Sequence, residues 1–295
     1  MITGILAVDK PLGWTSHDVV ARVRRVAGQK QVGHAGTLDP LATGVLLLLL
    51  GKATKLSPYL MYSQKEYCAE VVLGATTDTD DGEGALAEQA DPSGATREKI
   101  DEVISRFLGT IQQVPPRYSA VRRGGKKLYV LARRGEVVEP EPREVVVYGI
   151  VLERWECPRL RLHVRCGAGT YIRSLARDIG AALAVGGYLH ALRRTQSGTF
   201  TIAECARLDS ITDQDALTRA LLPPDRAVIS MPAAVLPEDQ ARAICMGQAV
   251  PLPRPVHGSM RVYDPAGRLI ALAEGVEEQI RPFRVFDGGP YARGD

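Results

Sequence analysis

Two runs of apolar residues near the start of the chain predict buried β-strands. Residues 45–50 are six consecutive apolar residues without polar alternation. A bilayer span takes about 20 such residues, so this run is too short to cross a membrane and is typical of a strand buried on both faces. Residues 5–8 predict a second, shorter strand that leads into a turn over residues 9–13.

An amphipathic helix is predicted between these two strands. Its apolar side consists of valines at helical spacing, namely Val19, Val20, Val23 and Val26. Ser16 is placed to cap the helix, Asp18 lies in its first turn, and Gly28 is a typical stop signal. The valine side is therefore expected to pack inward.

The middle of the chain mixes predicted strands and helices. Strand patterns cover residues 66–73, 143–155 and 160–166, and the face of the first strand that carries Tyr67 is otherwise apolar. Helices are expected over residues 51–62, from Thr96 to about 108, and after Thr170, which we expect to cap its helix.

A domain boundary is predicted after residue 221, where three prolines cluster (Pro223, Pro224 and Pro232). Beyond it lie one short helical pattern, PEDQARAICMG, and a compact β pattern around a turn at residues 264–267. The 295 residues are therefore predicted to form an α+β protein, with a large domain over residues 1–230 and a small β domain over 231–295.

Composition narrows the class of protein. Apolar residues make up 45% of the chain and charged residues 24%, which is ordinary for a soluble globular protein. No segment has the length of a membrane span, and the first residues, MITGILAVDK, do not resemble a signal peptide. We therefore expect a cytoplasmic protein without a membrane partner.

The sequence predicts no metal and no nucleotide cofactor. The five cysteines are scattered without CxxC spacing, so free thiols are expected. Residues 76–84, TTDTDDGEG, fail as a calcium loop because their glycine comes one place early. Residues 44–54 fail as a P-loop, because six residues instead of four separate the first glycine from the Gly-Lys pair.

Charge leaves nucleic-acid binding open. The net charge is only +3, but basic residues gather in three clusters. These clusters are Arg22, Arg24, Arg25 and Lys30; then Arg117, Arg122, Arg123, Lys126, Lys127, Arg133 and Arg134; and finally Arg193 and Arg194. Such clusters can bind phosphates, and ordinary solvated surfaces show the same pattern.

One carboxylate occupies an unusual setting. Asp39 lies in GHAGTLDPLATGVLLLLLGK (residues 33–52), on a glycine-rich turn that leads into the buried strand. A carboxylate on so rigid a turn could be a nucleophile, a general base or a metal ligand, or could simply cap the turn. Arg173 is also unusual, because an arginine in the first turn of a helix opposes the helix dipole and suggests an anionic partner.

Several separate motifs resemble one family. DKPLGWTSHDVV, the Asp39 segment, the K-x-Y of Lys65 to Tyr67, the T-D-T-x-D of residues 77–81, GTYIR and GYLHALRRTQSGTF occur in order between about residues 5 and 200. Together they resemble the TruB family of bacterial tRNA pseudouridine synthases. The resemblance implies a pseudouridine synthase fold with a mixed, mostly antiparallel sheet flanked by helices and loops.

The resemblance also implies roles for individual residues. Asp39 would be the catalytic nucleophile, Arg173 would pair with it, and Tyr67 would stack on the target base and assist proton transfer. The substrate-binding set would be His34, which holds the T loop, Tyr171 and Leu192, which line the uracil pocket, and Lys10, which supports the active-site loop. Without the resemblance, Tyr67 and Leu192 would be ordinary core residues and His34 a structural histidine.

The implied function is isomerisation of uridine 55 in the T loop of tRNA to pseudouridine, without cofactor or metal. The partner would be the tRNA T stem-loop, bound by a monomer. An RNA-clasping insertion is expected at about residues 115–140, where basic residues alternate with Tyr118 and Tyr129. Residues 231–295 would form a PUA-like RNA-binding domain.

Two alternatives remain at this point. A non-catalytic RNA-binding or tRNA chaperone protein on the same fold would be expected to have lost Asp39, Tyr67 or Arg173, and all three are present. An aspartate-dependent hydrolase acting on a small substrate would be expected to place a second acid or base beside its nucleophile.

Overall fold

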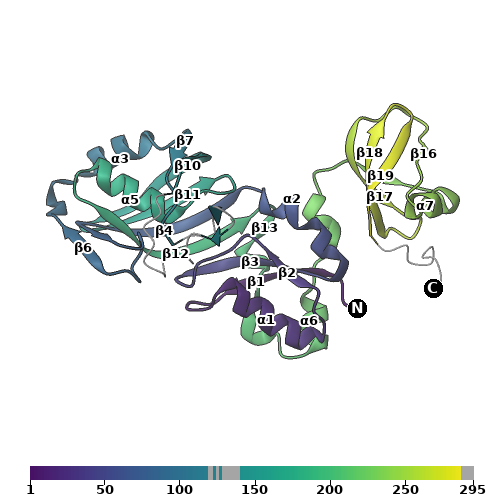
Figure 1. The fold of residues 1–295 in the computed structure, drawn as a ribbon, viewed down its shortest axis with the longest axis horizontal. Coiled ribbons are helices and arrows are strands. Elements are labelled where there is room, and N and C mark those ends of the chain that lie inside the picture. Colours follow the sequence, from purple (N-terminus) through teal and green to yellow (C-terminus); the bar gives the residue numbers. More distant parts are fainter. Residues whose placement is uncertain (119–121, 124–125, 128–139, 287–295) are drawn as a thin grey trace.

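A mixed sheet of ten strands forms the body of the molecule (Figure 1). We describe it from a computed structural model that covers residues 1–118, 122–123, 126–127 and 140–286. The strand order is β14-β1-β3-β12-β4-β11-β10-β7, with β13 paired to β12 and β2 paired to β3. Within the described residues, only the β1–β14 and β3–β12 pairs of this sheet are parallel. The predicted α+β fold with a mostly antiparallel sheet is confirmed.

The strands of this sheet are β1 (Gly4–Lys10), β2 (Val32–Ala35), β3 (Ala42–Leu50), β4 (Lys65–Leu73), β7 (Gly109–Gln113), β10 (Arg143–Glu156), β11 (Arg159–Cys166), β12 (Gly187–Ser197), β13 (Phe200–Thr201) and β14 (Ala206–Arg207). Two small hairpins lie outside it, formed by β5 (Ala75–Thr77) with β6 (Leu86–Gln89), and by β8 (Arg122–Arg123) with β9 (Lys126–Lys127). The β8–β9 hairpin belongs to the predicted RNA-clasping insertion, most of which, including Tyr129, Arg133 and Arg134, lies outside the described residues.

Helices flank the sheet. The α-helices are α1 (Ser16–Ala27), α2 (Ser57–Met61), α3 (Arg97–Ser105), α5 (Ile172–Ala182), α6 (Gln214–Ala220) and α7 (Glu238–Cys245). The short 3-10 helices are η1 (Gly51–Leu56), η2 (Pro92–Gly94), η3 (Ile202–Glu204), η4 (Leu208–Ser210) and η5 (Pro224–Val228). In Figure 1, α3 and α5 lie against the half of the sheet that contains β10 and β11, whereas α1 and α6 lie beside β1 and β2. No helix in the described part of the chain is long and apolar enough to cross a membrane.

Strand β3 is buried on both faces, as its unbroken apolar run predicts. Leu46, Leu48 and Leu50 pack into the core that contains α1 and α5. Their neighbours Val45, Leu47 and Leu49 pack into a second core on the other face, together with residues of η1 and α2. Because β3 is enclosed in this way, it holds in place the end of the Asp39 loop, which enters the strand at residue 42.

The start of α1 differs from the sequence prediction. Thr15, and not Ser16, caps the helix: its hydroxyl accepts from the Asp18 N–H at 3.0 Å, and the Asp18 carboxylate accepts from the Thr15 N–H at 3.0 Å. The Ser16 hydroxyl instead donates to the Leu38 carbonyl at 3.0 Å and accepts from the Leu38 N–H at 2.9 Å. Ser16 therefore ties α1 to the residue that precedes Asp39. Gly28 ends the helix in the left-handed region, as predicted.

Two other helix predictions are corrected in detail. Residues 51–62 form a 3-10 helix followed by the single turn of α2, because Pro58 falls at the start of that turn. Helix α5 begins after Tyr171 without a side-chain cap, since the Thr170 hydroxyl donates to the Gly167 carbonyl at 3.1 Å instead. Helix α3 is capped by Thr96 as predicted and ends at Ser105.

A separate five-stranded sheet follows η5. Its order is β15-β17-β18-β19-β16, and its strands are β15 (Ala233–Val235), β16 (Val250–Pro251), β17 (Gly258–Tyr263), β18 (Leu269–Val276) and β19 (Gln279–Val285). The predicted turn at residues 264–267 joins β17 to β18. A small apolar cluster of Leu56, Val228 and Leu272 joins this sheet to η1 and η5. The small C-terminal β domain is thus present, and Figure 1 shows it at one end of the molecule.

Replacing Ser16 with alanine tests how α1 holds the Asp39 segment. Ser16→Ala leaves the buried N–H and carbonyl of Leu38 without these partners, so we expect a loss of about 1–3 kcal/mol in the free energy of unfolding. The control is Ser210→Ala, which removes an exposed hydroxyl bonded to one carbonyl. Thermal unfolding of both variants gives the comparison, and equal stability of the two would contradict this role of Ser16.

Candidate active site

Asp39 lies on a loop that three different elements hold. Its predecessor Leu38 is bonded to Ser16 of α1. The carbonyl of its successor, Pro40, accepts from the Gly13 N–H at 2.9 Å and from Lys10 Nζ at 3.3 Å. The Asp39 carbonyl itself accepts from the Ala42 N–H at 3.0 Å. The backbone around the carboxylate is therefore fixed on both sides.

Lys10 supports this loop from inside the protein. Its side chain is fully buried, and Nζ donates to the carbonyls of Pro11, Trp14 and Pro40 at 3.0, 2.6 and 3.3 Å. Burial lowers the pKa of Lys10 to about 8, although Asp39 acts in the opposite direction. These contacts agree with the loop-supporting role that the resemblance implies for Lys10, and its membership of the substrate-binding set stays a prediction.

Arg173 pairs with Asp39 from the first turn of α5. The Arg173 side chain is 6% exposed, and its Nε lies 3.0 Å from Asp39 Oδ2. The other two nitrogens point elsewhere: Nη1 lies 3.3 Å from Asp81 Oδ2 and donates to the Thr79 carbonyl, and Nη2 donates to the Tyr118 carbonyl. Arg173 therefore has two anionic partners, the carboxylates of Asp39 and Asp81. Asp39 contacts one nitrogen of the guanidinium and not two.

Asp81 is the part of this cluster that the sequence analysis missed. Its side chain is 5% exposed. Its Oδ1 accepts from the Thr79 hydroxyl at 2.6 Å and from the Glu83 N–H at 3.1 Å. Asp81 therefore anchors Arg173 from the side opposite Asp39. A second arginine of α5 also binds an aspartate of this loop: Arg177, one turn after Arg173, lies 2.8 Å from Asp80.

Desolvation raises the pKa of Asp39. Protein surrounds much of the carboxylate, although solvent still reaches 36% of the side chain. Burial is the largest influence and raises the pKa, the charge of Arg173 lowers it, and the nearby charge of Asp81 raises it further. The result is a carboxylate whose pKa lies above the ordinary value of 3.8 and that remains accessible to a reactant.

Tyr67 and Leu192 lie side by side on the sheet. Leu192 of β12 is paired with Ala69 of β4, and Arg194, two residues later, is paired with Tyr67. Tyr67 is 8% exposed and Leu192 is 9% exposed. Burial raises the pKa of the Tyr67 hydroxyl, and the positive charge of Arg194 acts against this effect. A β-bulge at His190 interrupts the predicted alternation of β12, so Leu192 shares its face with Leu189 and not with His190.

His34 lies in β2, and Tyr171 immediately precedes α5. Burial and the charge of Arg194 lower the pKa of His34, so its imidazole is neutral near pH 7. No described residue hydrogen-bonds to its buried Nδ1. Tyr171 is held through its backbone by Gln113, whose amide accepts from the Tyr171 N–H at 2.8 Å and donates to its carbonyl at 3.1 Å.

Arg194 is not part of a surface cluster, contrary to the sequence analysis. Arg193 is 43% exposed and pairs with Asp9, but Arg194 is 1% exposed.

Within the described residues, no group of three or more His, Cys, Asp or Glu side chains is arranged to hold a metal ion.

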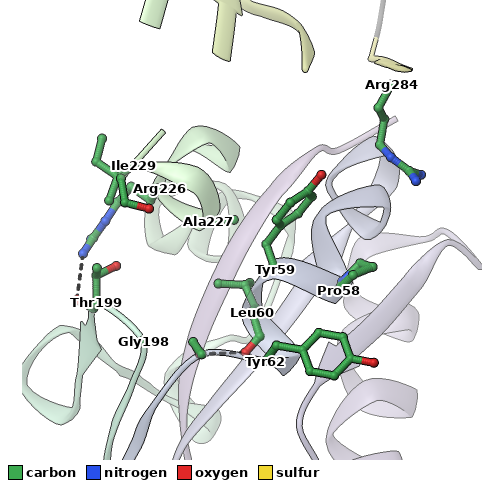
Figure 2. Close-up of a pocket in the computed structure, with 12 residues that line it drawn as sticks. Pro58, Tyr59, Leu60, Tyr62, Gly198, Thr199, Arg226, Ala227, Ile229 and Arg284 are labelled. Atoms are coloured by element: carbon green, nitrogen blue, oxygen red, sulfur yellow. Dashed lines mark hydrogen bonds between the residues drawn. The ribbon is translucent and has the colours of Figure 1, made fainter. Parts of the chain in front are cut away.

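A pocket of about 550 Å³ lies elsewhere, between α2, η5 and β19. Figure 2 shows Tyr59 and Tyr62 on one side of it and Arg226 with Thr199 on the other. Its lining contains none of the seven predicted site residues. The Asp39 cluster, where an accessible carboxylate meets a buried guanidinium, is therefore separate from this pocket.

Three family models match the chain in succession. They are described as the N-terminal domain of TruB family pseudouridylate synthase (residues 24–172), the C-terminal domain of tRNA pseudouridylate synthase B (173–229) and the C-terminal part of tRNA pseudouridine synthase II (231–287). Two relatives named tRNA pseudouridine synthase B, from Thermobifida fusca and Pseudomonas putida, are each 43% identical. The matches cover 98% of this chain and 100% of the first protein, and 96% and 95% for the second.

Two solved structures share the fold of this chain. One is a chain of an H/ACA RNP bound to a substrate RNA containing 2′-deoxyuridine, with a TM-score of 0.74 and 25% identity over 98% of this chain and 87% of the other. Another belongs to a Cbf5-Nop10-Gar1 complex, with a TM-score of 0.73 and 28% identity over 99% of this chain and 87% of the other.

Asp39→Asn tests the electrostatics of this cluster. Because the folded state raises the pKa of Asp39, folding disfavours the charged form, and this cost is absent well below pH 3.8 and complete above the folded pKa. The neutral variant should therefore have the higher melting temperature at pH 7, with the difference vanishing in acid. Asp81→Asn is the control and should melt lower, because it loosens Thr79, Glu83 and Arg173. A less stable Asp39→Asn protein at pH 7 would contradict this account.

Proposed function

This chain belongs to the TruB family of pseudouridine synthases, and on that premise we propose that it isomerises uridine 55 in the T loop of tRNA, with Asp39 as the nucleophile. The observation that supports the role of Asp39 most strongly is its ion pair with Arg173 at 3.0 Å on an accessible side chain. A carboxylate must be ionised to attack, and burial works against ionisation. Arg173 offsets that effect while leaving part of the carboxylate open.

The side chains around Asp39 suit a base that has left its stack. A uridine inside a folded loop must be extruded, which costs roughly a few kcal/mol of unstacking. In our proposal the Tyr67 ring stacks on the extruded uracil, and Leu192 and Tyr171 line its pocket. His34, neutral and with an unpartnered Nδ1, contacts the T loop.

Three routes fit a nucleophilic carboxylate at this position. Asp39 attacks C1′ of the ribose, or attacks C6 of the uracil, or assists loss of the 2′ proton. In each route the C1′–N1 bond breaks and its electron pair leaves with the base. A C1′–C5 bond then forms, C5 loses a proton and N1 gains one. The bond from Asp39 to C1′ or C6 breaks again in the first two routes, and in the third route the 2′ proton returns to C2′. The reaction is balanced within the nucleotide and Asp39, so no cofactor enters the proposal.

The domains divide the RNA contacts. We propose that residues 1–230 form the catalytic domain, that the insertion at about 115–140 clasps the RNA, and that residues 231–295 form a PUA-like RNA-binding domain. Every residue of the proposed site comes from one chain, so a monomer is sufficient. The proposed substrate places the protein in the cytoplasm.

The hydrolase alternative receives no support from the second acid near Asp39. Asp81 is 4% exposed, and its oxygens are occupied by Thr79, Glu83 and Arg173. It can orient Arg173, but it cannot reach a substrate or activate a water outside the protein. The non-catalytic RNA-binding alternative is tested directly by the experiment below.

Pseudouridine mapping on an unmodified tRNA transcript tests the proposal. The wild-type chain should convert uridine 55, and Asp39→Asn should bind the tRNA but form no pseudouridine. Asp101→Asn is the control, because it neutralises an aspartate whose side chain is 53% exposed and should leave conversion unchanged. Tight tRNA binding without conversion by the wild-type chain would favour the non-catalytic alternative, and conversion by Asp39→Asn would refute the role of Asp39.

Arg173→Lys tests the contribution of the guanidinium. A lysine keeps the charge but cannot reach Asp39, Asp81 and the Tyr118 carbonyl together, so Asp39 should be misplaced and the single-turnover rate should fall on the order of 100-fold. Arg177→Lys, in the same helix but paired with Asp80, should lose much less. Equal losses in the two variants would show that Arg173 has no special relation to Asp39.

A further inference from the structure

Arg194 is a buried cation beside two residues of the proposed site. At 1% exposure it heads the largest fully buried side chains of the described residues. It is paired in register with Tyr67 on β4 and with Gly44 on β3, and it shares its face of β12 with Leu192. Two of the side chains proposed to contact the uracil are therefore its immediate neighbours.

The guanidinium of Arg194 closes the segment that carries Asp39. Its Nε donates to the Val45 carbonyl at 2.6 Å and its Nη2 donates to the Gly36 carbonyl at 3.1 Å. These two carbonyls lie on either side of Asp39 in the sequence. One side chain therefore fixes both ends of the loop.

The close approach of the backbone of residue 194 explains a glycine near the start of β3. A Cβ atom at Gly44 would lie 2.2 Å from the Arg194 carbonyl oxygen, and Gly44 has a φ of +97°. No side chain can be accommodated there. The backbones of β3 at Gly44 and of β12 at residue 194 therefore lie in close contact.

The charge of Arg194 is not balanced locally. No carboxylate in the described part of the chain forms an ion pair with it, and its charge lowers the pKa of its neighbours Lys10, Lys65 and His34. Burying an unpaired cation is costly. Arg194 also forms a side-chain hydrogen bond with Tyr67, but the Val45 carbonyl, the Gly36 carbonyl and the Tyr67 hydroxyl are all neutral partners, so hydrogen bonding alone does not account for a charged group at this position.

An anion formed in the site would supply the missing balance. In the proposed reaction the base leaves C1′ with the electron pair of the C1′–N1 bond, and negative charge develops on the uracil while it is detached. A fixed positive charge in a water-poor site stabilises such a charge far more than it would in water.

We propose that Arg194 is a positioning residue that fixes both ends of the Asp39 loop and places a positive charge under the uracil, where it stabilises the negative charge of the detached base. This inference rests on the proposed function. It predicts that the charge of Arg194 affects bond cleavage, whereas its effect on tRNA binding is small.

The test uses the full chain with Arg194→Gln, which removes the charge and keeps a donor, and Arg194→Lys, which keeps a charge at a shorter reach. Each variant is assayed for tRNA affinity and for the first-turnover rate of consuming the target nucleoside. The substrates are a tRNA with uridine and a tRNA with 5-fluorouridine at that position. Fluorine withdraws electrons, so the fluorinated base leaves with less need for an external positive charge.

With uridine, we expect Arg194→Gln to lose on the order of 100-fold in rate and Arg194→Lys to lose less, at unchanged tRNA affinity. With 5-fluorouridine both losses should shrink. The control is Arg193→Gln, which alters the neighbouring, exposed arginine and should show the same relative rate on both substrates.

A purely structural role would reduce the rate equally on both nucleosides, and that result, or an unchanged rate in Arg194→Gln, would overturn the proposal. If Arg194→Gln does not fold, the comparison of the two nucleosides with Arg194→Lys decides the question. Failure of the wild-type chain to convert uridine would be a different result, because it would refute the proposed function itself.

Discussion

The site depends on keeping a carboxylate charged in surroundings that disfavour its charge. Desolvation raises the pKa of Asp39, and the Arg173 guanidinium 3.0 Å away acts against that rise. Burial has the larger effect, so the pKa of Asp39 stays above its ordinary value although Arg173 lowers it. In the proposed reaction, attack on a carbon removes the charge that the protein disfavours.

The fold supplies this balance by bringing distant segments to one place. Asp39 comes from the loop before β3, Arg173 from the first turn of α5, and Asp81 from the loop after β5. Backbone contacts fix the neighbours of Asp39 and Arg173: Ser16 holds Leu38, Lys10 holds Pro40, and Gln113 holds Tyr171. Asp81 is held through its own side chain by Thr79 and Glu83. The buried strand β3 provides the rigid base. Precise placement therefore comes from polar contacts at the edge of an apolar core, and not from the core alone.

Local patterns in the sequence predicted much of the fold. The unbroken apolar run predicted the doubly buried β3, and the valine spacing predicted α1. The cap of α1 was misplaced although the sequence holds the correct signal, since Thr15 has an acid three residues later and Ser16 does not. The family motifs pointed to Asp39 and Arg173, and the structure places them together.

Other parts of the site have no local signal. Asp81 lies in a segment that the sequence analysis read as a failed calcium loop and as one of the family motifs, but neither pattern indicates its partner Arg173, which is far away in the chain. Gln113 and Tyr171 are 58 residues apart. The sequence analysis grouped Arg194 with Arg193 as a basic cluster. Neighbouring residues of a strand point to opposite faces, and composition does not show which face is buried, so the burial of Arg194 was missed.

The most direct test is to titrate the Asp39 carboxyl carbon by ¹³C NMR in the full-length protein, with its resonance assigned by its loss in Asp39→Asn. The account predicts a pKa above the ordinary value of 3.8, and a further rise in Arg173→Gln, which removes the opposing charge. A pKa at or below 3.8 in the wild-type protein, or no change in Arg173→Gln, would contradict it.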